Sequence, residues 1–122
     1  MKKKIFSLII LGLLNVLSIS DQETFKVMFY NLLNYPLEDA VPGREQDLAF
    51  ILADYQPDLF LVCELNNITG ANNVLNITRT SINQNFEMAT YVSNTSDDSF
   101  GDQNDLQNML YYNSSKFSIQ EE

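Results

Sequence analysis

The segment DLFLVCE, residues 58–64, decides the fold of this chain. It is an almost continuous apolar run whose length fits a β-strand buried on both faces of a sheet. Before it, REQDLAFILADY at 44–55 spaces its apolar residues as one face of a helix, and Pro57 ends that helix. Earlier still, TFKVMFYN at 24–31 alternates and carries Phe, Val and Tyr, which predicts a strand that ends at Asn31.

The order strand, helix, strand predicts a βαβ unit, and therefore an α/β fold. Its two strands should be parallel, with a right-handed crossover, so that their carboxyl ends lie at the same edge of the sheet. Open α/β sheets place their sites at this edge, and here the two strands end in Asn31 and Glu64. We therefore expect these two side chains to lie close together. For Glu64 taken alone, an ordinary solvent-facing residue at a strand end remains the alternative.

The remaining sequence predicts less regular structure. Residues 32–43 contain Pro and Gly and are expected to form a turn region, and Arg44 after it is interpreted as a surface charge. The other expected pieces are a helix within 65–86, a strand at 86–92, a polar loop at 93–105, and a hairpin formed by 109–112 and 117–119. The loop is acidic but lacks EF-hand spacing, which favours a solvated turn over a calcium site.

The first twenty residues have the order of a secretory signal. Lys2, Lys3 and Lys4 are followed by an apolar run at 5–17 and by small residues up to Ser20. The run is short for a membrane-spanning helix, which needs ~20 residues. We expect a signal peptide at 1–20, a single domain at 21–122, a secreted or periplasmic location, and no membrane association after cleavage. An uncleaved membrane anchor is the alternative.

Composition excludes some classes of function. The net charge is −9, and three of the seven basic residues lie in the expected signal peptide. Binding of nucleic acid by neutralising phosphates needs a surplus of Lys and Arg, so stable nucleic-acid binding by this chain is not expected. The chain has no His, the commonest general base, and a single cysteine, Cys63, which cannot form an intrachain disulfide and is interpreted as an inert thiol.

Two motifs resemble a known family. FKVMFYNLLNYP at 25–36 and QPDLFLVCEL at 56–65 resemble, in order and spacing, the opening motifs of the endonuclease/exonuclease/phosphatase family, to which deoxyribonuclease I belongs. Asn31 matches the Asn that ends the family's first strand, and Glu64 matches the Glu that ends the second. The residue before that Glu is commonly Gln in the family and is Cys63 here.

The resemblance extends to about Phe117. In MLYYNSSKF, residues 109–117, it rests on Tyr111, Tyr112 and Lys116, but the Arg often found in that motif is absent. Two core tyrosines are therefore the preferred interpretation at this point.

The resemblance implies both a fold and a chemistry. The family fold is a four-layered α/β sandwich, of which this chain would supply an incomplete part, about one sheet plus flanking helices. Glu64 would bind Mg²⁺ or Mn²⁺, and Asn31 would hydrogen-bond the scissile phosphate or a metal-bound water. The family's Asp-His pair and Asp-x-Asn motif belong to the second half of its fold, and this chain has no His.

We therefore expect the N-terminal part of a secreted metal-dependent phosphoesterase, acting on nucleic acid or a small phosphodiester and inactive by itself. One alternative is an exported, non-catalytic binding module that retains half of the hydrolase scaffold. Another is a small acidic hydrolase that uses Glu64 and the loop aspartates. Because the chain would supply only part of the sandwich, the inner face of its sheet would lack its partner, which favours aggregation or pairing with something that covers it.

Overall fold

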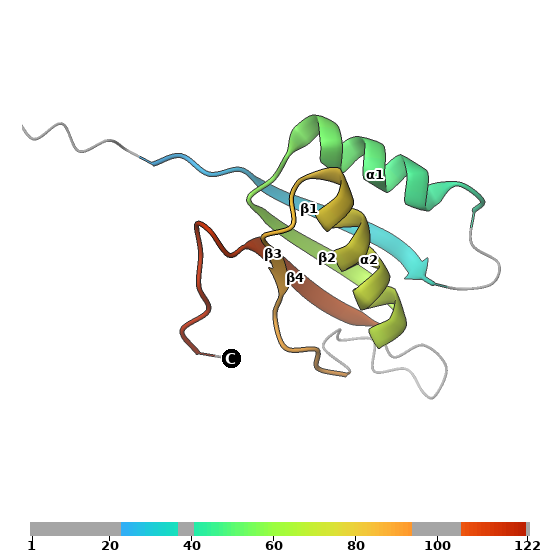
Figure 1. The fold of residues 1–122 in the computed structure, drawn as a ribbon. Helices are drawn as coiled ribbons and strands as arrows, with labels where there is room; N and C mark the ends of the chain where they lie inside the picture. Colours follow the sequence, from blue (N-terminus) through green and yellow to red (C-terminus); the bar gives the residue numbers. More distant parts are fainter. Residues whose placement is uncertain (1–22, 37–40, 94–105, 122) are drawn as a thin grey trace, which may run out of the picture.

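The computed structural model describes residues 23–36, 41–93 and 106–121, which form a four-stranded mixed sheet with two helices (Figure 1). The expected α/β class is therefore confirmed. In chain order the elements are β1 (Val27–Tyr35), α1 (Arg44–Tyr55), β2 (Leu59–Leu65), α2 (Ile68–Ser81), β3 (Phe86–Met88) and β4 (Gln107–Asn113). Across the sheet the strand order is β1-β2-β4-β3.

The βαβ unit has the predicted parallel pairing. β1 and β2 run side by side in register from the pair Val27 and Leu59 to the pair Asn31 and Cys63. The helix between them, α1, spans the predicted residues. β4 is antiparallel to both of its neighbours, β2 and β3.

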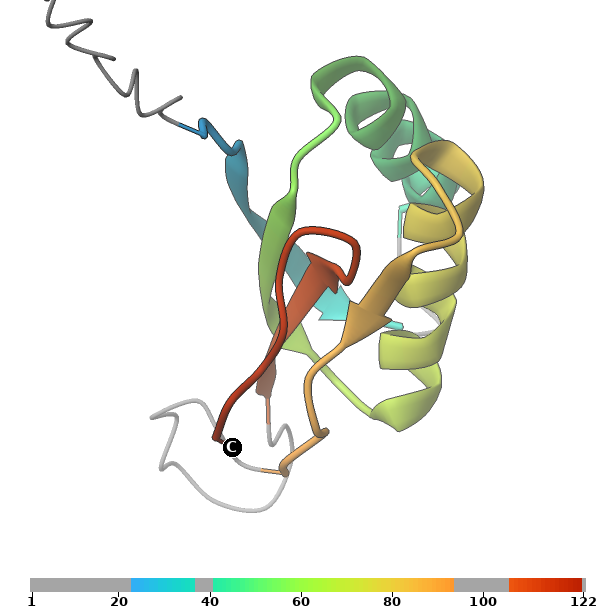
Figure 2. The same cartoon turned by 60° about the vertical axis from the view of Figure 1, so that its left-hand side comes forward.

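Both helices pack on one face of the sheet, as Figure 2 shows. Leu52 of α1 and Val74 of α2 are fully buried against that face, together with Phe60 of β2 and Tyr111 of β4. Each such side chain contributes about 1.5–3 kcal/mol through its removal from water. The Tyr111 hydroxyl donates to the Ala71 carbonyl at 3.0 Å, so the polar end of this core residue is satisfied.

The opposite face carries apolar side chains that no helix covers among the described residues. Val27 and Phe29 of β1 point to this face and are 45% and 68% exposed. Farther along, residues 117–121 line a shallow hollow together with Glu87 and Tyr112. An α/β layer with one apolar face open is the arrangement that an incomplete sandwich predicts.

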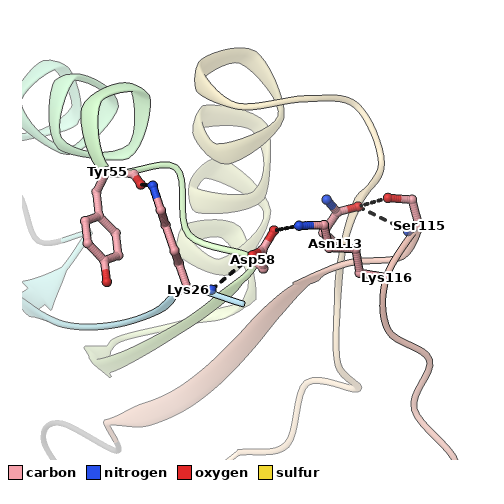
Figure 3. Close-up of polar contacts among 6 residues, drawn as sticks. All are labelled: Lys26, Tyr55, Asp58, Asn113, Ser115 and Lys116. Atoms are coloured by element: carbon pink, nitrogen blue, oxygen red, sulfur yellow. Dashed lines mark hydrogen bonds and ion pairs between the residues drawn. The ribbon is translucent and has the colours of Figure 1, made fainter. Parts of the chain in front are cut away.

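Asp58 ties the ends of three strands together at the amino end of β2 (Figure 3). Its carboxylate accepts the Lys26 backbone N–H at 3.0 Å and pairs with the Lys116 ammonium at 2.8 Å. Its carbonyl oxygen accepts the Asn113 N–H at 3.0 Å. The Pro-Asp that opens the second motif is therefore explained by a structural role, because Asp58 joins the chain before β1 to the end of β4.

Two predicted strand boundaries and one predicted hairpin were wrong. β1 does not end at Asn31 but continues to Tyr35, and β3 ends at Met88 rather than at residue 92. The expected hairpin of 109–112 with 117–119 does not form, because β4 already pairs with a strand on each side and has no free edge. Instead the Asn113 carbonyl accepts N–H groups of Lys116 and Phe117 in a turn that leads the chain away from the sheet.

The expected signal peptide at 1–20 and nearly all of the acidic loop at 93–105 lie outside the described residues. Neither of the two helices in the described part combines the length and the apolar character needed to cross a membrane.

Candidate functional site

Asn31 and Glu64 meet where the regular parallel pairing of β1 with β2 stops, in the middle of β1 and near the carboxyl end of β2. The Asn31 Nδ2 donates a hydrogen bond of 2.7 Å to Glu64 Oε1, between strands that are adjacent in the sheet. The proximity predicted from the parallel topology is therefore found, while the catalytic and metal-binding roles of the two residues remain predictions.

The orientation of the Asn31 amide is determined by its surroundings. Its Oδ1 accepts the Leu33 backbone N–H at 2.7 Å, which leaves Nδ2 to face the Glu64 carboxylate. If the amide were flipped, its NH₂ group would face the Leu33 N–H, and its oxygen would face the Glu64 carboxylate. Neither contact could then be a hydrogen bond. Asn31 is exposed, so the second Nδ2 hydrogen can reach an acceptor that arrives from solvent.

A β-bulge in β2 determines where Glu64 points. In the pairing of β2 with β4, Val62 lies opposite Met109, and the next pair is Leu65 opposite Gln107. Between these two pairs β2 has two residues and β4 has one. Glu64 lies in that irregular step. Bulges of this kind redirect a side chain and are over-represented beside active sites.

The bulge keeps the carboxylate out of the core. Phe60 and Val62 are buried on the helix-covered face, and regular alternation would place Glu64 there next. Because of the extra residue, Leu65 is buried instead and Glu64 is only half-buried. An unpaired carboxylate in the core costs several kcal/mol, so this one-residue irregularity is a condition for having Glu64 at this position.

The backbone at both strand ends is left-handed although no glycine is present. Glu64 has φ 56°, and on the neighbouring strand Leu33 and Asn34 have φ 52° and 56°. For residues other than glycine this conformation costs about 1–2 kcal/mol each. Such outliers cluster at functional sites, where the surrounding structure holds them in place. The sequence carries no signal for Leu33 and Glu64, because Gly and Asn are the residues that normally mark this conformation, and only Asn34 is one of them.

Arg44 is not the simple surface charge that was expected. At the first residue of α1, its Nη1 donates to the carbonyl oxygens of both Leu32 and Leu33 at 2.9 Å. The guanidinium also lies 4.8 Å from the centre of the Tyr35 ring. The reason for the difference is tertiary: α1 begins beside the last residues of β1, where these carbonyl oxygens have left the regular ladder.

A cavity of about 210 Å³ lies beside Asn31. It is bounded by residues of β1, α1 and α2, among them Leu33 and Arg44, and by Val41, which precedes α1, and its wall is mainly apolar. Pockets for small organic ligands measure about 300–1,000 Å³, so this cavity is small for a substrate pocket.

The donor set at the strand ends fits a partial magnesium site. No cluster of three or more His, Cys, Asp or Glu residues occurs in the described part of the chain, so Glu64 is a lone carboxylate. Mg²⁺ keeps several waters and is commonly held by one or two carboxylates plus substrate phosphates. Glu64 can therefore supply one ligand. The Asn31 side chain faces Glu64 with its donor nitrogen, while its Oδ1 is turned towards the Leu33 N–H.

Cys63 adds no ligand to this set. Burial, and then the charge of Glu64, raise the pKa of its thiol above the usual range. A protonated thiol is a poor nucleophile and a poor ligand for a hard cation, which agrees with the interpretation as an inert cysteine.

The third motif lies away from Asn31 and Glu64. Tyr111 is fully buried in the core, and Tyr112, nearly buried, donates to Glu87 at 3.0 Å. Their interpretation as core residues is therefore confirmed. Lys116 pairs with Asp58, at the amino end of β2, so this lysine does not contribute to the candidate site.

The sequence matches no protein-family model, and no curated protein matches it.

Proposed function

We propose that this chain is the N-terminal part of a secreted Mg²⁺-dependent phosphoesterase, a nuclease or phosphodiesterase that hydrolyses phosphate esters with activated water. The observation that carries the proposal is the 2.7 Å hydrogen bond between Asn31 and Glu64, at the point where the regular pairing of two parallel strands stops. The bulge and the left-handed backbone at the same strand ends support it, because both features are frequent at active sites.

Glu64 is the proposed metal ligand. Its Oε1 accepts the hydrogen bond from Asn31, and Oε2 is the oxygen that can bind Mg²⁺ or Mn²⁺. When bound, such a cation activates water and offsets the negative charge of a phosphate ester. Contact with Asn31 limits the rotation of the carboxylate, so Glu64 can receive the cation without first becoming ordered.

Asn31 is the proposed phosphate contact. One hydrogen of its Nδ2 is directed at Glu64, and the other can donate to a phosphate oxygen. A fixed donor aimed at an oxygen on which negative charge grows lowers the activation barrier. Phosphate esters, either nucleic acid or small phosphodiesters, are therefore the proposed substrates of the whole enzyme.

The sequence contains no His, the commonest general base, and the family that the motifs resemble uses an Asp-His pair from the second half of its fold, so the proposal places the base outside this chain. We therefore expect the isolated chain to be inactive towards a model diester such as bis(p-nitrophenyl) phosphate, with Mg²⁺ present.

Paramagnetic broadening by Mn²⁺ tests the metal site. In amide NMR spectra of the labelled chain, signals of Leu65 and Asn31 should broaden at Mn²⁺ concentrations that leave the far side of α1 unaffected, and Mg²⁺ should reverse the effect. Glu64→Gln should abolish this broadening. The matched control is Glu87→Gln, at an exposed position of β3 in the same sheet, which should leave it intact. Equal broadening in wild type and Glu64→Gln would reject Glu64 as the ligand.

The coding DNA provides a second test. Sequences for Asp-x-Asn and Ser-Asp-His should follow the codon for Glu122, and their absence in every reading frame would count against a phosphoesterase.

The open sheet face favours one competing function, an exported binding module without catalysis. Val27 and Phe29 form an exposed apolar pair on β1 that a partner can cover. Under this alternative the chain is monodisperse and folds cooperatively, and Glu64→Gln leaves partner binding unchanged.

A further inference from the structure

The orientation of Asn31 depends on the three residues that follow it. Its Oδ1 accepts the Leu33 N–H, and this contact requires Leu33 to keep its left-handed conformation, with φ 52°. Asn34 is left-handed as well. These residues lie where β1 has two residues more than β2 between the paired positions Asn31 and Tyr35, so regular strand pairing does not hold them.

Arg44 holds this segment from the adjacent helix. One nitrogen, Nη1, bridges the carbonyl oxygens of Leu32 and Leu33, and the guanidinium carbon lies over the Tyr35 ring, 4.8 Å from its centre. Planar geometry allows Arg to combine both contacts, whereas the ammonium of Lys cannot stack in this way.

The remaining guanidinium nitrogens show that the side chain is not optimised for stability alone. Nε and Nη2 of Arg44 are buried, and neither has a hydrogen-bond partner among the described residues. Unsatisfied buried donors are unfavourable, and an apolar side chain of similar volume would avoid that cost. The two carbonyl contacts to Leu32 and Leu33 are what an apolar side chain cannot supply.

We infer that Arg44 is a positioning residue, which fixes the turn at Leu32 and Leu33 and thereby holds the Asn31 amide against Glu64. The inference rests on the proposed function for its catalytic meaning. The hydrogen-bond chain itself, from Arg44 through Leu33 and Asn31 to Glu64, can be tested without any activity.

The test compares Arg44→Met and Arg44→Lys with a matched control, Arg79→Met. Arg79 is also a helical Arg that donates to a backbone carbonyl, from Nε to Phe86 at 2.8 Å, but on α2 and away from Asn31. NMR would follow hydrogen exchange at the Leu33 amide and the position of the Asn31 side-chain amide signals. In both Arg44 variants, hydrogen exchange at the Leu33 amide should be about tenfold faster. This is the change expected when the hydrogen bond from the Leu33 N–H to Asn31 is lost.

The Asn31 side-chain signals separate positioning from general stabilisation. In both Arg44 variants they should move towards the values of a solvated Asn, while in Arg79→Met they should stay at wild-type positions even if the protein is less stable. Unchanged Asn31 signals in folded Arg44→Lys or Arg44→Met would overturn the inference. So would failure of both Arg44 variants to fold while Arg79→Met folds, because Arg44 would then be required by the fold as a whole.

Mn²⁺ broadening on the same samples distinguishes this inference from the proposed function. Broadening at Leu65 in wild type together with unperturbed Asn31 signals in the Arg44 variants would refute positioning and leave the metal site standing. Absence of broadening in wild type, with Asn31 displaced in the Arg44 variants, would refute the metal site and leave the hydrogen-bond chain standing.

Discussion

At the scale of single residues, Glu64 combines two properties that the strand pattern does not favour. It stands in a β-bulge and has φ 56°, in the left-handed region. Both features serve one end, since together they direct a carboxylate away from the helix-covered core and towards Asn31. A residue with a favourable backbone at this position would be Gly, which has no side chain to bind anything.

Replacement of Glu64 by Gly and by Ala tests this strain. Both variants lose the carboxylate, but only Gly adopts positive φ without a steric penalty, so Glu64→Gly should be more stable than Glu64→Ala by about 1 kcal/mol. Urea unfolding followed by circular dichroism measures the difference. At Glu87, a position of β3 without positive φ, the order should reverse, because Gly weakens an ordinary strand. If the Ala variant were more stable than the Gly variant at Glu64 as well as at Glu87, the result would contradict a strained backbone at Glu64.

At the scale of elements, α2 packs against the end of β1 through the one residue without a side chain. A Cβ atom on Gly70 would lie 2.6 Å from Pro36 Cδ and 3.1 Å from Leu65 Cδ1. Asn67 is the N-cap of this helix, and its Oδ1 accepts a hydrogen bond of 2.9 Å from the Gly70 N–H. The first turn of α2 is therefore held close to the strand ends that carry Asn31 and Glu64.

Gly70→Ala should destabilise the protein although Ala is the better helix former. The added methyl group would force Pro36 or Leu65 to move, and overpacking of this kind costs about 1–3 kcal/mol. Thermal and urea unfolding would measure the loss. The control is Asn76→Ala, at an exposed position of the same helix, which should be neutral or slightly stabilising. A Gly70→Ala variant as stable as wild type would contradict the close packing.

Asp58, which connects the chain before β1 with the end of β4, should make stability depend on pH. Burial raises the pKa of its carboxyl, but the hydrogen bonds from Lys116 and from the Lys26 backbone outweigh burial, and the pKa lies below its ordinary value. The folded state therefore binds the proton more weakly than the unfolded state. The stabilisation is present above the unfolded-state pKa and is lost as pH falls through the folded-state pKa.

Urea unfolding of wild type and Asp58→Asn at a series of pH values tests this dependence. At neutral pH, Asp58→Asn should be less stable than wild type, and the gap should narrow as the pH falls into the acid range. Lys116→Met removes only the half-exposed partner of the ion pair and should cost less, as exposed ion pairs contribute about 0–1 kcal/mol. A gap that stays constant down to acid pH would show that Asp58 is not the titrating group.

At the scale of the whole molecule, helices cover one face of the sheet (Figure 2). The other face carries the exposed apolar side chains of Val27 and Phe29. Phe29, 68% exposed, is the largest side chain that β1 presents to that side. This distribution agrees with a layer that belongs to a larger sandwich, and it conflicts with the solubility that the net charge of −9 would otherwise give.

The purified chain should therefore self-associate, and Phe29→Thr should weaken that association. Sedimentation velocity over a range of concentrations would show a higher average mass for wild type than for Phe29→Thr, and added salt should strengthen the effect by screening the negative charges. Ile68→Thr is the control, because it removes an exposed apolar side chain from α2 instead of the open face. If both substitutions reduce association equally, the sheet face is not the surface responsible.

The sequence was sufficient for the βαβ unit and for the pairing of Asn31 with Glu64. Three local patterns predict these elements: the alternation at 24–31, the helical spacing at 44–55 and the apolar run at 58–64. Each pattern reflects which side chains are buried on folding. Parallel topology then follows from connection length alone, and it brings the two strand ends to one edge.

Only the tertiary structure decided the details of the candidate site at this edge. The bulge at Glu64 depends on how β2 pairs with β4, a strand more than forty residues later, and the position of β4 between two neighbours is also what prevents the expected hairpin. The contact of Arg44 with Leu32 and Leu33 depends on where α1 begins relative to β1. Local sequence patterns indicate whether a side chain is buried, but they do not indicate which distant strand or helix it contacts. Those tertiary contacts determine strand register, bulges and the partners of buried polar groups.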